Sequence, residues 1–192
     1  LILAAFGSAQ TVFGIYFKLQ SFVFMPVFGL NNGMVPIIAY NYGAGHKDRV
    51  IKTIKHSVAY GVGIMFVGLL AMHIFPAQLM RMFDAEESLI AIGAPALETI
   101  SLSFVFAGFC IVAGSVFQAL GNGVYSMIVS VARQMCVLLP VAKLLSLSGE
   151  VTLIWWAFPI AELASVLLTS YFLVRIYRKV ICHIGEPVVQ DA

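Results

Sequence analysis

Four ionisable side chains lie inside long apolar stretches of the sequence, where they could pair with one another or bind an ion: Lys18, Glu98, Arg133 and Glu162. Charged groups are costly inside a bilayer and usually face the interior of a helical bundle or water. Each lies about nine or ten residues from the start of its stretch, roughly 13–15 Å deep at the rise of an α-helix and near the middle of a hydrocarbon core. We therefore predict a nearly neutral cluster at the midplane, in which the two basic residues face the two acidic ones.

Three interpretations of this cluster are open. The charges could form buried ion pairs that fix helix register, or a coupling or substrate site whose protonation changes, and Glu98 could instead reach the outer surface. If the cluster lines a cavity, Glu162 and then Glu98 are the first candidates for proton or cation binding. Four amides extend the candidate pathway, although each can equally join two helices by a hydrogen bond: Gln20, Asn31, Gln118 and Gln134.

The composition indicates an integral membrane protein. Of 192 residues, 61% are hydrophobic and only 10% are charged, against about 25% charged in soluble domains. The net charge of +2 gives no argument for nucleic acid. The three cysteines and four histidines show no metal-binding spacing, so we expect no metal, cofactor or disulfide.

The positions of the apolar stretches predict an all-α bundle of five membrane spans with no sheet. We expect spans at about 9–42, 51–75, 89–120, 124–147 and 151–178, a turn at Gly7–Ser8, a short interfacial piece at 77–83 and a bend at Pro95. Trp155 and Trp156 fit an aromatic belt at the membrane surface. We place a membrane lobe at residues 1–179, with its first helix truncated, and a tail at 180–192 that is disordered from Ile181 onward.

Basic residues predict the orientation of the spans. The loop at 45–55 and the segment after the last span carry most of the Lys and Arg: Lys47, Arg49, Lys52, Lys55, Arg175, Arg178 and Lys179. The positive-inside rule places this loop and the C-terminus in the cytoplasm.

The first full span carries an unusual set of helix breakers. Gly29 and Gly33 form a GxxxG pair that lets another helix approach, and Pro26 and Pro36 each remove an amide donor and favour a kink. The segment is either a packing helix with two kinks or a hinge that also lines a cavity.

This segment resembles the eighth transmembrane helix of multidrug and toxic compound extrusion (MATE) transporters. The resemblance rests on Pro26, Gly29, Leu30, Gly33 and Pro36, followed by Tyr40–Ala44. Later segments agree in order: Phe117–Gly121, Arg133–Gln134, Pro140, Trp155, Ala157 and Pro159–Glu162. It implies the C-terminal half of a two-lobed bacterial inner-membrane antiporter that exports organic cations or drugs against Na⁺ or H⁺ and needs an N-terminal lobe. Aromatic residues of the first span could stack on a flat organic cation: Phe13, Tyr16, Phe17, Phe22, Phe24 and Phe28.

Other functions remain as alternatives. Relatives in the same superfamily flip lipids or lipid-linked saccharides, but the nearly neutral cluster does not favour such a substrate. An intramembrane enzyme would need a catalytic dyad at one depth, and no predicted span contains an Asp. We therefore predict that the protein is not an enzyme.

Overall fold

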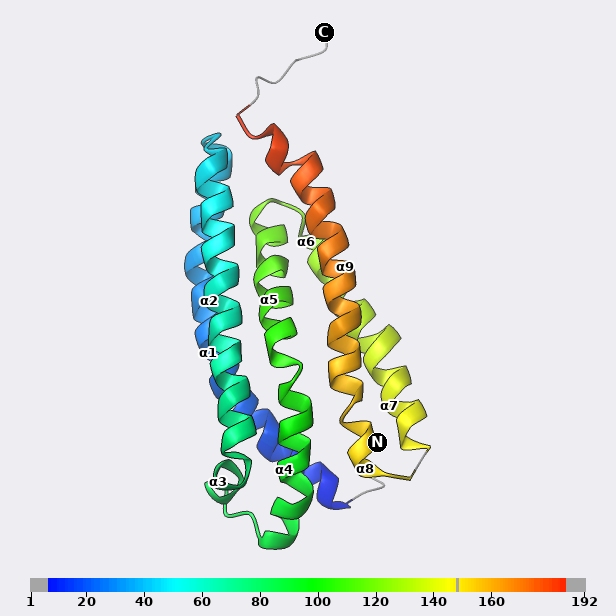
Figure 1. Ribbon diagram of the computed structural model, residues 1–192. Helices are drawn as coiled ribbons and strands as arrows, with labels where there is room; N and C mark the ends of the chain where they lie inside the picture. Colours follow the sequence, from blue (N-terminus) through cyan, green and yellow to red (C-terminus); the bar gives the residue numbers. More distant parts are fainter. Residues whose placement is uncertain (1–6, 148, 186–192) are drawn as a thin grey trace.

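The longest element is α1 (Gly7–Gly43), a helix of 37 residues that continues through Pro26 and Pro36 without a break. The computed structural model describes residues 7–147 and 149–185, and within these ranges every regular element is a helix. In Figure 1 the first turns of α1 run obliquely past α4 and the rest of the helix lies along α2. The turn predicted at Gly7–Ser8 is wrong, because both residues already belong to α1.

Helix α2 (Lys47–Ile74) returns antiparallel to α1 and is followed by the short α3 (Pro76–Arg81). Pro76 is the first residue of α3, where its missing N–H needs no helical partner. The next span consists of α4 (Glu87–Ser101) and α5 (Phe104–Ala119), whose axes differ by 46°.

The bend in this span lies at Leu102–Ser103, so the bend predicted at Pro95 is misplaced. Pro95 lies inside α4. Just before the bend, the Ser101 hydroxyl donates to the carbonyl of Glu98 at 2.9 Å, and the Ser103 hydroxyl donates to that of Ile100 at 2.6 Å. Serine hydroxyls that bond to preceding carbonyls compete with the helix ladder and favour a bend.

The fourth span changes its helical winding in the middle. It begins with α6 (Gly123–Val131), continues as the π-helix η2 (Ala132–Leu138) and ends with α7 (Leu139–Ser146). The Leu139 amide donates to the carbonyl of Gln134, five residues earlier. Pro140 follows directly, and it has no N–H for an α-helical bond and crowds the carbonyl four residues before it.

The last span is a short helix α8 (Val151–Ile154), a turn at Trp155–Trp156 and the long helix α9 (Ala157–Lys179). A 3₁₀ turn, η3 (Ile181–His183), follows it. Ile181 and Ile184 are buried, and Lys47 Nζ donates to the carbonyl of Cys182 at 2.7 Å. The prediction of disorder from Ile181 onward is therefore wrong for residues 181–185, and residues 186–192 lie outside the described ranges.

Close approach of α2 and α5 depends on small residues. A Cβ placed on Gly108 would lie 2.8 Å from Cγ of Met65 and 3.0 Å from the carbonyl oxygen of Gly61. A Cβ on Gly29 or Gly33 would instead meet no described atom within 4 Å. Within the described chain, helix packing therefore uses Gly61 and Gly108 and leaves the GxxxG pair of α1 open.

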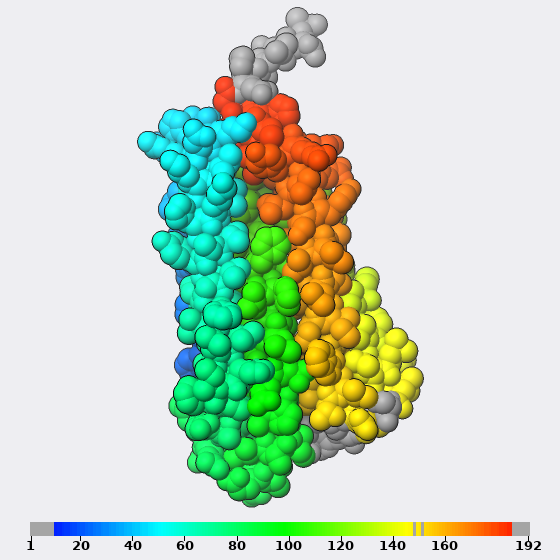
Figure 2. All heavy atoms as spheres, in the orientation of Figure 1, coloured from blue at the N-terminus to red at the C-terminus, as the bar shows by residue number. Residues whose placement is uncertain are grey.

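Four helices are long and apolar enough to cross a membrane in the described ranges, or five spans if the bent pair α4–α5 counts as one. The prediction of an all-helical bundle with about five spans is confirmed. Figure 1 shows α1, α2, α4 and α5 on one side of the bundle, with α6, α7, α8 and α9 on the other. Figure 2 shows α2, α5 and α9 side by side on one outer face.

Candidate functional site

A cavity of about 780 Å³ lies between the first half of α1, the start of α5 and the helices η2, α7, α8 and α9. Its aromatic lining consists of Phe13, Tyr16, Phe17, Phe24, Trp155 and Phe158. Its polar lining consists of Gln10, Gln20, Ser103, Arg133, Gln134 and Glu162. This volume falls within the range of pockets that hold drug-sized molecules, roughly 300–1,000 Å³.

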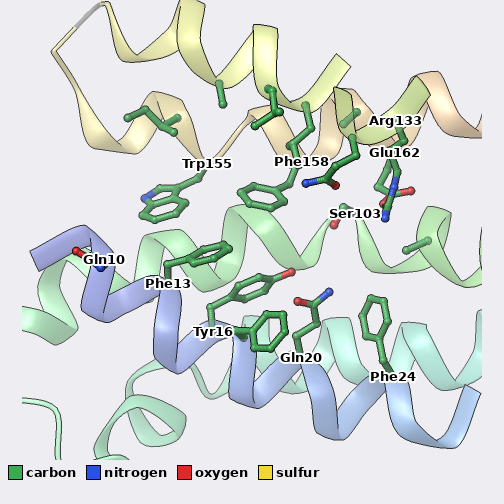
Figure 3. Close-up of a pocket in the computed structure, with 18 residues that line it drawn as sticks. Gln10, Phe13, Tyr16, Gln20, Phe24, Ser103, Arg133, Trp155, Phe158 and Glu162 are labelled. Carbon is green, nitrogen blue, oxygen red and sulfur yellow. The ribbon is translucent and has the colours of Figure 1, made fainter. Parts of the chain in front are cut away.

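The aromatic rings face each other across the cavity from two helices. Phe13 and Tyr16 project from α1, and their ring centroids lie 6.0 Å and 6.1 Å from that of Phe158 on α9. In Figure 3, Trp155 and Phe158 lie above the rings of Phe13 and Tyr16. The planes of Phe13 and Tyr16 are tilted by 31° and 60° from that of Phe158. Such ring faces can contact an aromatic ligand, and their electron-rich surfaces attract cations.

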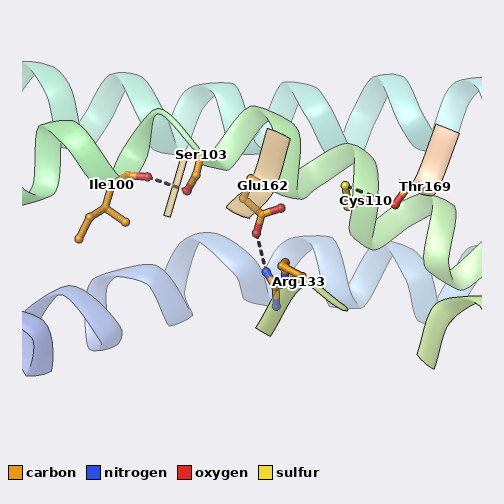
Figure 4. A network of polar contacts seen from close by, with 6 residues as sticks. All are labelled: Ile100, Ser103, Cys110, Arg133, Glu162 and Thr169. Atoms are coloured by element: carbon orange, nitrogen blue, oxygen red, sulfur yellow. Dashed lines mark hydrogen bonds and ion pairs between the residues drawn. The ribbon is translucent and has the colours of Figure 1, made fainter. Parts of the chain in front are cut away.

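One ion pair lies in the wall of the cavity, between η2 and α9. Arg133 Nη1 donates to Glu162 Oε1 at 2.5 Å (Figure 4). Glu162 is buried, and its second oxygen, Oε2, has no hydrogen-bond partner among the described residues. The pair leaves the cavity nearly neutral, while the carboxylate keeps one acceptor oxygen for a further donor or cation.

The buried face of α9 continues from this pair as a row of polar side chains. Ser165 and Thr169 follow Glu162 at helical spacing, and both are buried. Thr169 Oγ1 donates to Cys110 Sγ at 3.7 Å, which joins α9 to α5 (Figure 4). The Oγ of Ser165 is buried without a partner among the described residues.

Arg133 lies at the start of the π-helix η2. A π-turn takes up one more residue than an α-turn, so it shifts the residues before it around the helix axis. Both Arg133 and Gln134 lie in η2, and both line the cavity. Single π-helical segments occur frequently at functional sites, and here the segment places the basic partner of the only ion pair found in the described cavity wall.

The structure brings together four of the residues predicted from the sequence: Gln20, Arg133, Gln134 and Glu162. It does not bring in Lys18, whose Nζ lies 5.6 Å from the ring centroid of Phe83. At 100° per residue, Lys18 lies about 200° around α1 from both Tyr16 and Gln20, which face the cavity. The predicted four-residue cluster is therefore corrected to the single pair Arg133–Glu162.

Three other candidates also lie away from the cavity. Glu98 is half-buried in α4, before the bend, and forms no ion pair with a described residue. Asn31 is buried farther along α1, and its Oδ1 has no described partner. Gln118 Nε2 donates to Ser126 Oγ at 3.2 Å, a hydrogen bond between α5 and α6. Any role of these residues in a pathway stays a prediction.

The hinge and packing candidates on α1 are exposed: Pro26, Gly29, Gly33 and Pro36. Neither glycine approaches another described element. The predicted close approach at this GxxxG pair therefore does not occur within the described chain, and the hinge stays a prediction.

Among the aromatic and polar residues of the cavity, sequence reasoning missed four: Gln10, Ser103, Trp155 and Phe158. Trp155 is 1% exposed and lines the cavity, so its prediction as part of an aromatic belt is wrong, whereas Trp156 is 47% exposed. Trp155, Phe158 and Glu162 follow one another at intervals of three and four residues, which places them on one helix face. That spacing was the signal that could have identified them.

Sequence comparison matches residues 6–144 to the MatE family model. Among curated proteins, multidrug export protein MepA of Staphylococcus haemolyticus (strain JCSC1435) is 26% identical over 180 residues, which cover 93% of this chain and 39% of the relative. MepA of Staphylococcus aureus (strain N315) is 28% identical over 164 residues, covering 84% and 36%. The chain thus spans about two fifths of the length of these relatives.

Comparison with solved structures also finds MATE transporters. The MATE multidrug transporter DinF-BH, solved as a complex, superposes with a TM-score of 0.80 at 33% sequence identity and covers 91% of this chain and 40% of its own. The bent form of VcmN from Vibrio cholerae superposes with a TM-score of 0.87 at 17% identity, covering 95% and 42%, which shows a shared fold.

Proposed function

The chain belongs to the MatE family of membrane transporters, and we propose that it forms one lobe of an antiporter that exports organic cations or other drugs in exchange for Na⁺ or H⁺. The relatives that support this proposal are described as multidrug export proteins, and DinF-BH is described as a MATE multidrug transporter. The chain itself supplies about two fifths of such a protein. Substrate, coupling ion and partner lobe are therefore proposals for the whole transporter.

The observation that carries this proposal is the cavity at the Arg133–Glu162 pair. Its aromatic walls offer flat faces to an organic ring system. Glu162 provides a buried carboxylate with one oxygen free of described partners. A ligand cation and a coupling cation can compete for such a carboxylate, and this competition would link drug release to ion entry.

The charge of the lining favours organic cations over anionic lipid-linked substrates. Among the cavity residues only Arg133 carries a positive charge, and Glu162 neutralises it. An anionic headgroup would be better matched by a cavity with excess Arg or Lys. Flipping of a lipid or lipid-linked saccharide therefore remains the alternative function and is separated from drug export by the experiment below.

The partner that we propose for this chain is an N-terminal lobe of the same transporter. Support comes from the exposed side of α1, where Phe22 and Met25 are 72% and 68% exposed and where Gly29 and Gly33 contact no described side chain. Small residues in an apolar helix face permit close contact with another helix. Pro26 and Pro36 lie in the same region and could serve as the hinge when the lobes move.

We further propose an orientation in the bacterial inner membrane with the loop at 45–55 and the C-terminus on the cytoplasmic side. Basic residues gather at that end of the bundle, on α2 and at the end of α9. Labelling a cysteine introduced at Lys52 in spheroplasts tests the orientation: a membrane-impermeant maleimide should react only after the membrane is opened.

Transport by the whole protein in proteoliposomes tests the function. Ethidium movement should follow an imposed gradient of Na⁺ or of pH, and whichever gradient drives it identifies the coupling ion. Glu162→Gln should abolish driven movement, whereas Glu87→Gln, which removes an exposed carboxylate paired with Arg81, should leave it intact. Gradient-independent ethidium movement, or movement of a labelled lipid instead of ethidium, would contradict drug antiport.

A further inference from the structure

Helix α9 carries an exposed apolar stripe on the side that faces away from the cavity. Its members follow at intervals of three or four residues: Ile160, Leu163, Leu167, Tyr171 and Val174. Leu167 is 75% exposed and Tyr171 is 59% exposed. The buried residues Glu162, Ser165 and Thr169 lie roughly opposite around the helix. In a membrane, this stripe is the part of α9 that acyl chains can reach.

The stripe ends in a basic hollow near the C-terminal end of the helix. This hollow, of about 320 Å³, is lined by Tyr171, Val174, Arg175, Arg178 and Lys179. It contains no acidic residue, and its three cations form no ion pair with any described residue. The hollow therefore combines an apolar floor with uncompensated positive charge.

Arg175 is held in position by aromatic neighbours. Its guanidinium carbon lies 5.7 Å from the ring centroid of Tyr125, at the start of α6. The Tyr125 ring in turn stacks on Phe172, with centroids 4.5 Å apart and planes 10° from parallel. A guanidinium supported in this way loses less side-chain freedom when it binds an anion.

We propose that this hollow binds the headgroup of an anionic phospholipid, with the phosphate among Arg175, Arg178 and Lys179 and an acyl chain along Leu167 and Tyr171. Guanidinium groups pair with phosphate oxygens through charge-assisted hydrogen bonds. Basic residues that flank a membrane helix attract anionic lipids. The apolar stripe selects a lipid over free phosphate, because phosphate would gain nothing from contact with apolar side chains. This site is separate from the cavity and does not depend on the transport proposal.

Native mass spectrometry of the whole protein tests the site, with phosphatidylglycerol and phosphatidylcholine as the added lipids. The triple variant Arg175→Gln/Arg178→Gln/Lys179→Gln should retain at least about fivefold less phosphatidylglycerol, since one cation at a membrane surface alone contributes about fivefold. The matched control is Arg49→Gln/Lys52→Gln/Lys55→Gln, which removes three cations from α2 at the same end of the bundle. This control should retain clearly more phosphatidylglycerol than the triple variant, because its three cations do not line the hollow.

Two further measurements distinguish a bound lipid from free phosphate. Leu167→Gln/Tyr171→Gln should lower phosphatidylglycerol retention with all three cations in place, and inorganic phosphate at millimolar concentration should not displace the lipid. Equal losses in the triple variant and its α2 control would overturn the proposal, because general surface charge would then explain retention. Displacement by inorganic phosphate would overturn it as well. Should the triple variant fail to fold, the single variant Arg178→Gln gives the same comparison against Lys52→Gln.

Discussion

Arg133 Nη1 lies 2.5 Å from Glu162 Oε1, yet the Arg133 side chain is 40% exposed and that of Glu162 only 8%. Loss of the partner's charge should therefore cost more stability for Glu162 than for Arg133. If Glu162 loses its charge, the guanidinium can still contact water through the cavity. If Arg133 is removed, the carboxylate remains buried without its compensating charge.

This asymmetry predicts unequal effects on stability. Arg133→Met should lower the free energy of unfolding by up to about 3 kcal/mol, the low end for breaking a buried pair. Glu162→Gln should lower it by only about 1 kcal/mol, because the exposed partner stays solvated. Thermal unfolding in detergent measures both, with Arg81→Met as the control at an exposed pair. Equal losses for the two cavity variants would contradict the asymmetry.

The position of Lys18 beside Phe83 predicts that Lys18 and Glu162 act independently. The stability losses of Lys18→Met and Glu162→Gln should add within about 0.5 kcal/mol in the double variant, as expected for residues without contact. Arg133→Met combined with Glu162→Gln should instead show coupling of more than about 1 kcal/mol. Coupling between Lys18 and Glu162 of similar size would restore the four-residue cluster that the structure does not contain.

The aromatic walls predict a difference between two phenylalanines of the same helix. Phe13 lines the cavity and contacts Tyr16 and Phe158, whereas Phe22 is 72% exposed and does not line it. Phe13→Ala should weaken ethidium binding about fivefold to tenfold, the loss expected for one cation–π and stacking contact. Fluorescence titration of the whole protein measures the dissociation constant, and Phe22→Ala should leave it unchanged. A similar loss from both variants would place the dye outside this cavity.

The glycines predict which helix contacts are internal to this chain. Gly108→Ala should lower the free energy of unfolding by about 1–3 kcal/mol, because the added methyl group meets Met65 and the Gly61 carbonyl. Gly33→Ala should not lower it when this chain is expressed alone, since nothing described lies within 4 Å. Melting temperatures of the two variants make the comparison. In the proposed whole transporter, a loss from Gly33→Ala would locate the contact of the proposed second lobe on α1.

The position of Pro140 just after the π-helix predicts that replacing this proline removes the π-helix. Pro140→Ala restores an amide donor, so the fourth span can wind as an α-helix, which would turn Arg133 by about 100° relative to α7. The coupling between Arg133 and Glu162, measured by a double-mutant cycle in this background, should fall below about 0.5 kcal/mol. Unchanged coupling would show that Pro140 does not cause the π-helix or orient Arg133.

The spans and the polar candidates were predictable to different degrees. Apolar length identifies membrane helices directly, because backbone groups in lipid must bond within their own segment. Depth along a span is also readable from the sequence, and it correctly grouped Arg133 with Glu162. Depth does not give direction around the axis, and for this reason Lys18 was grouped with this pair incorrectly. Tyr16 and Gln20, which line the cavity, lie two residues before and after Lys18. Their helical spacing therefore places Lys18 on the opposite side of α1. Glu98 lies in α4, before the bend, and does not line the cavity.

Local changes of winding were harder to predict. The bend at Ser103 depends on two hydroxyl groups that reach back to preceding carbonyls, whereas Pro95, the stronger breaker by type, lies inside a helix. The π-helix before Pro140 and the turn at Trp155 each move an aromatic or charged side chain into the cavity. Such shifts by a single residue have no distinct composition, so the sequence predicted the helices better than the faces that they present.

The hydrogen bond from Lys47 to the Cys182 carbonyl joins the first residue of α2 to η3, the 3₁₀ turn that follows α9. The cavity lies toward the other end of α9, beside its first turns and the first half of α1. If α9 moved away from α2 without tilting, this bond would break, whereas a tilt of α9 about the end next to Cys182 would preserve it. A rotation of α9 about this contact would displace Ala157, at the far end of the helix, more than Lys179 beside the contact.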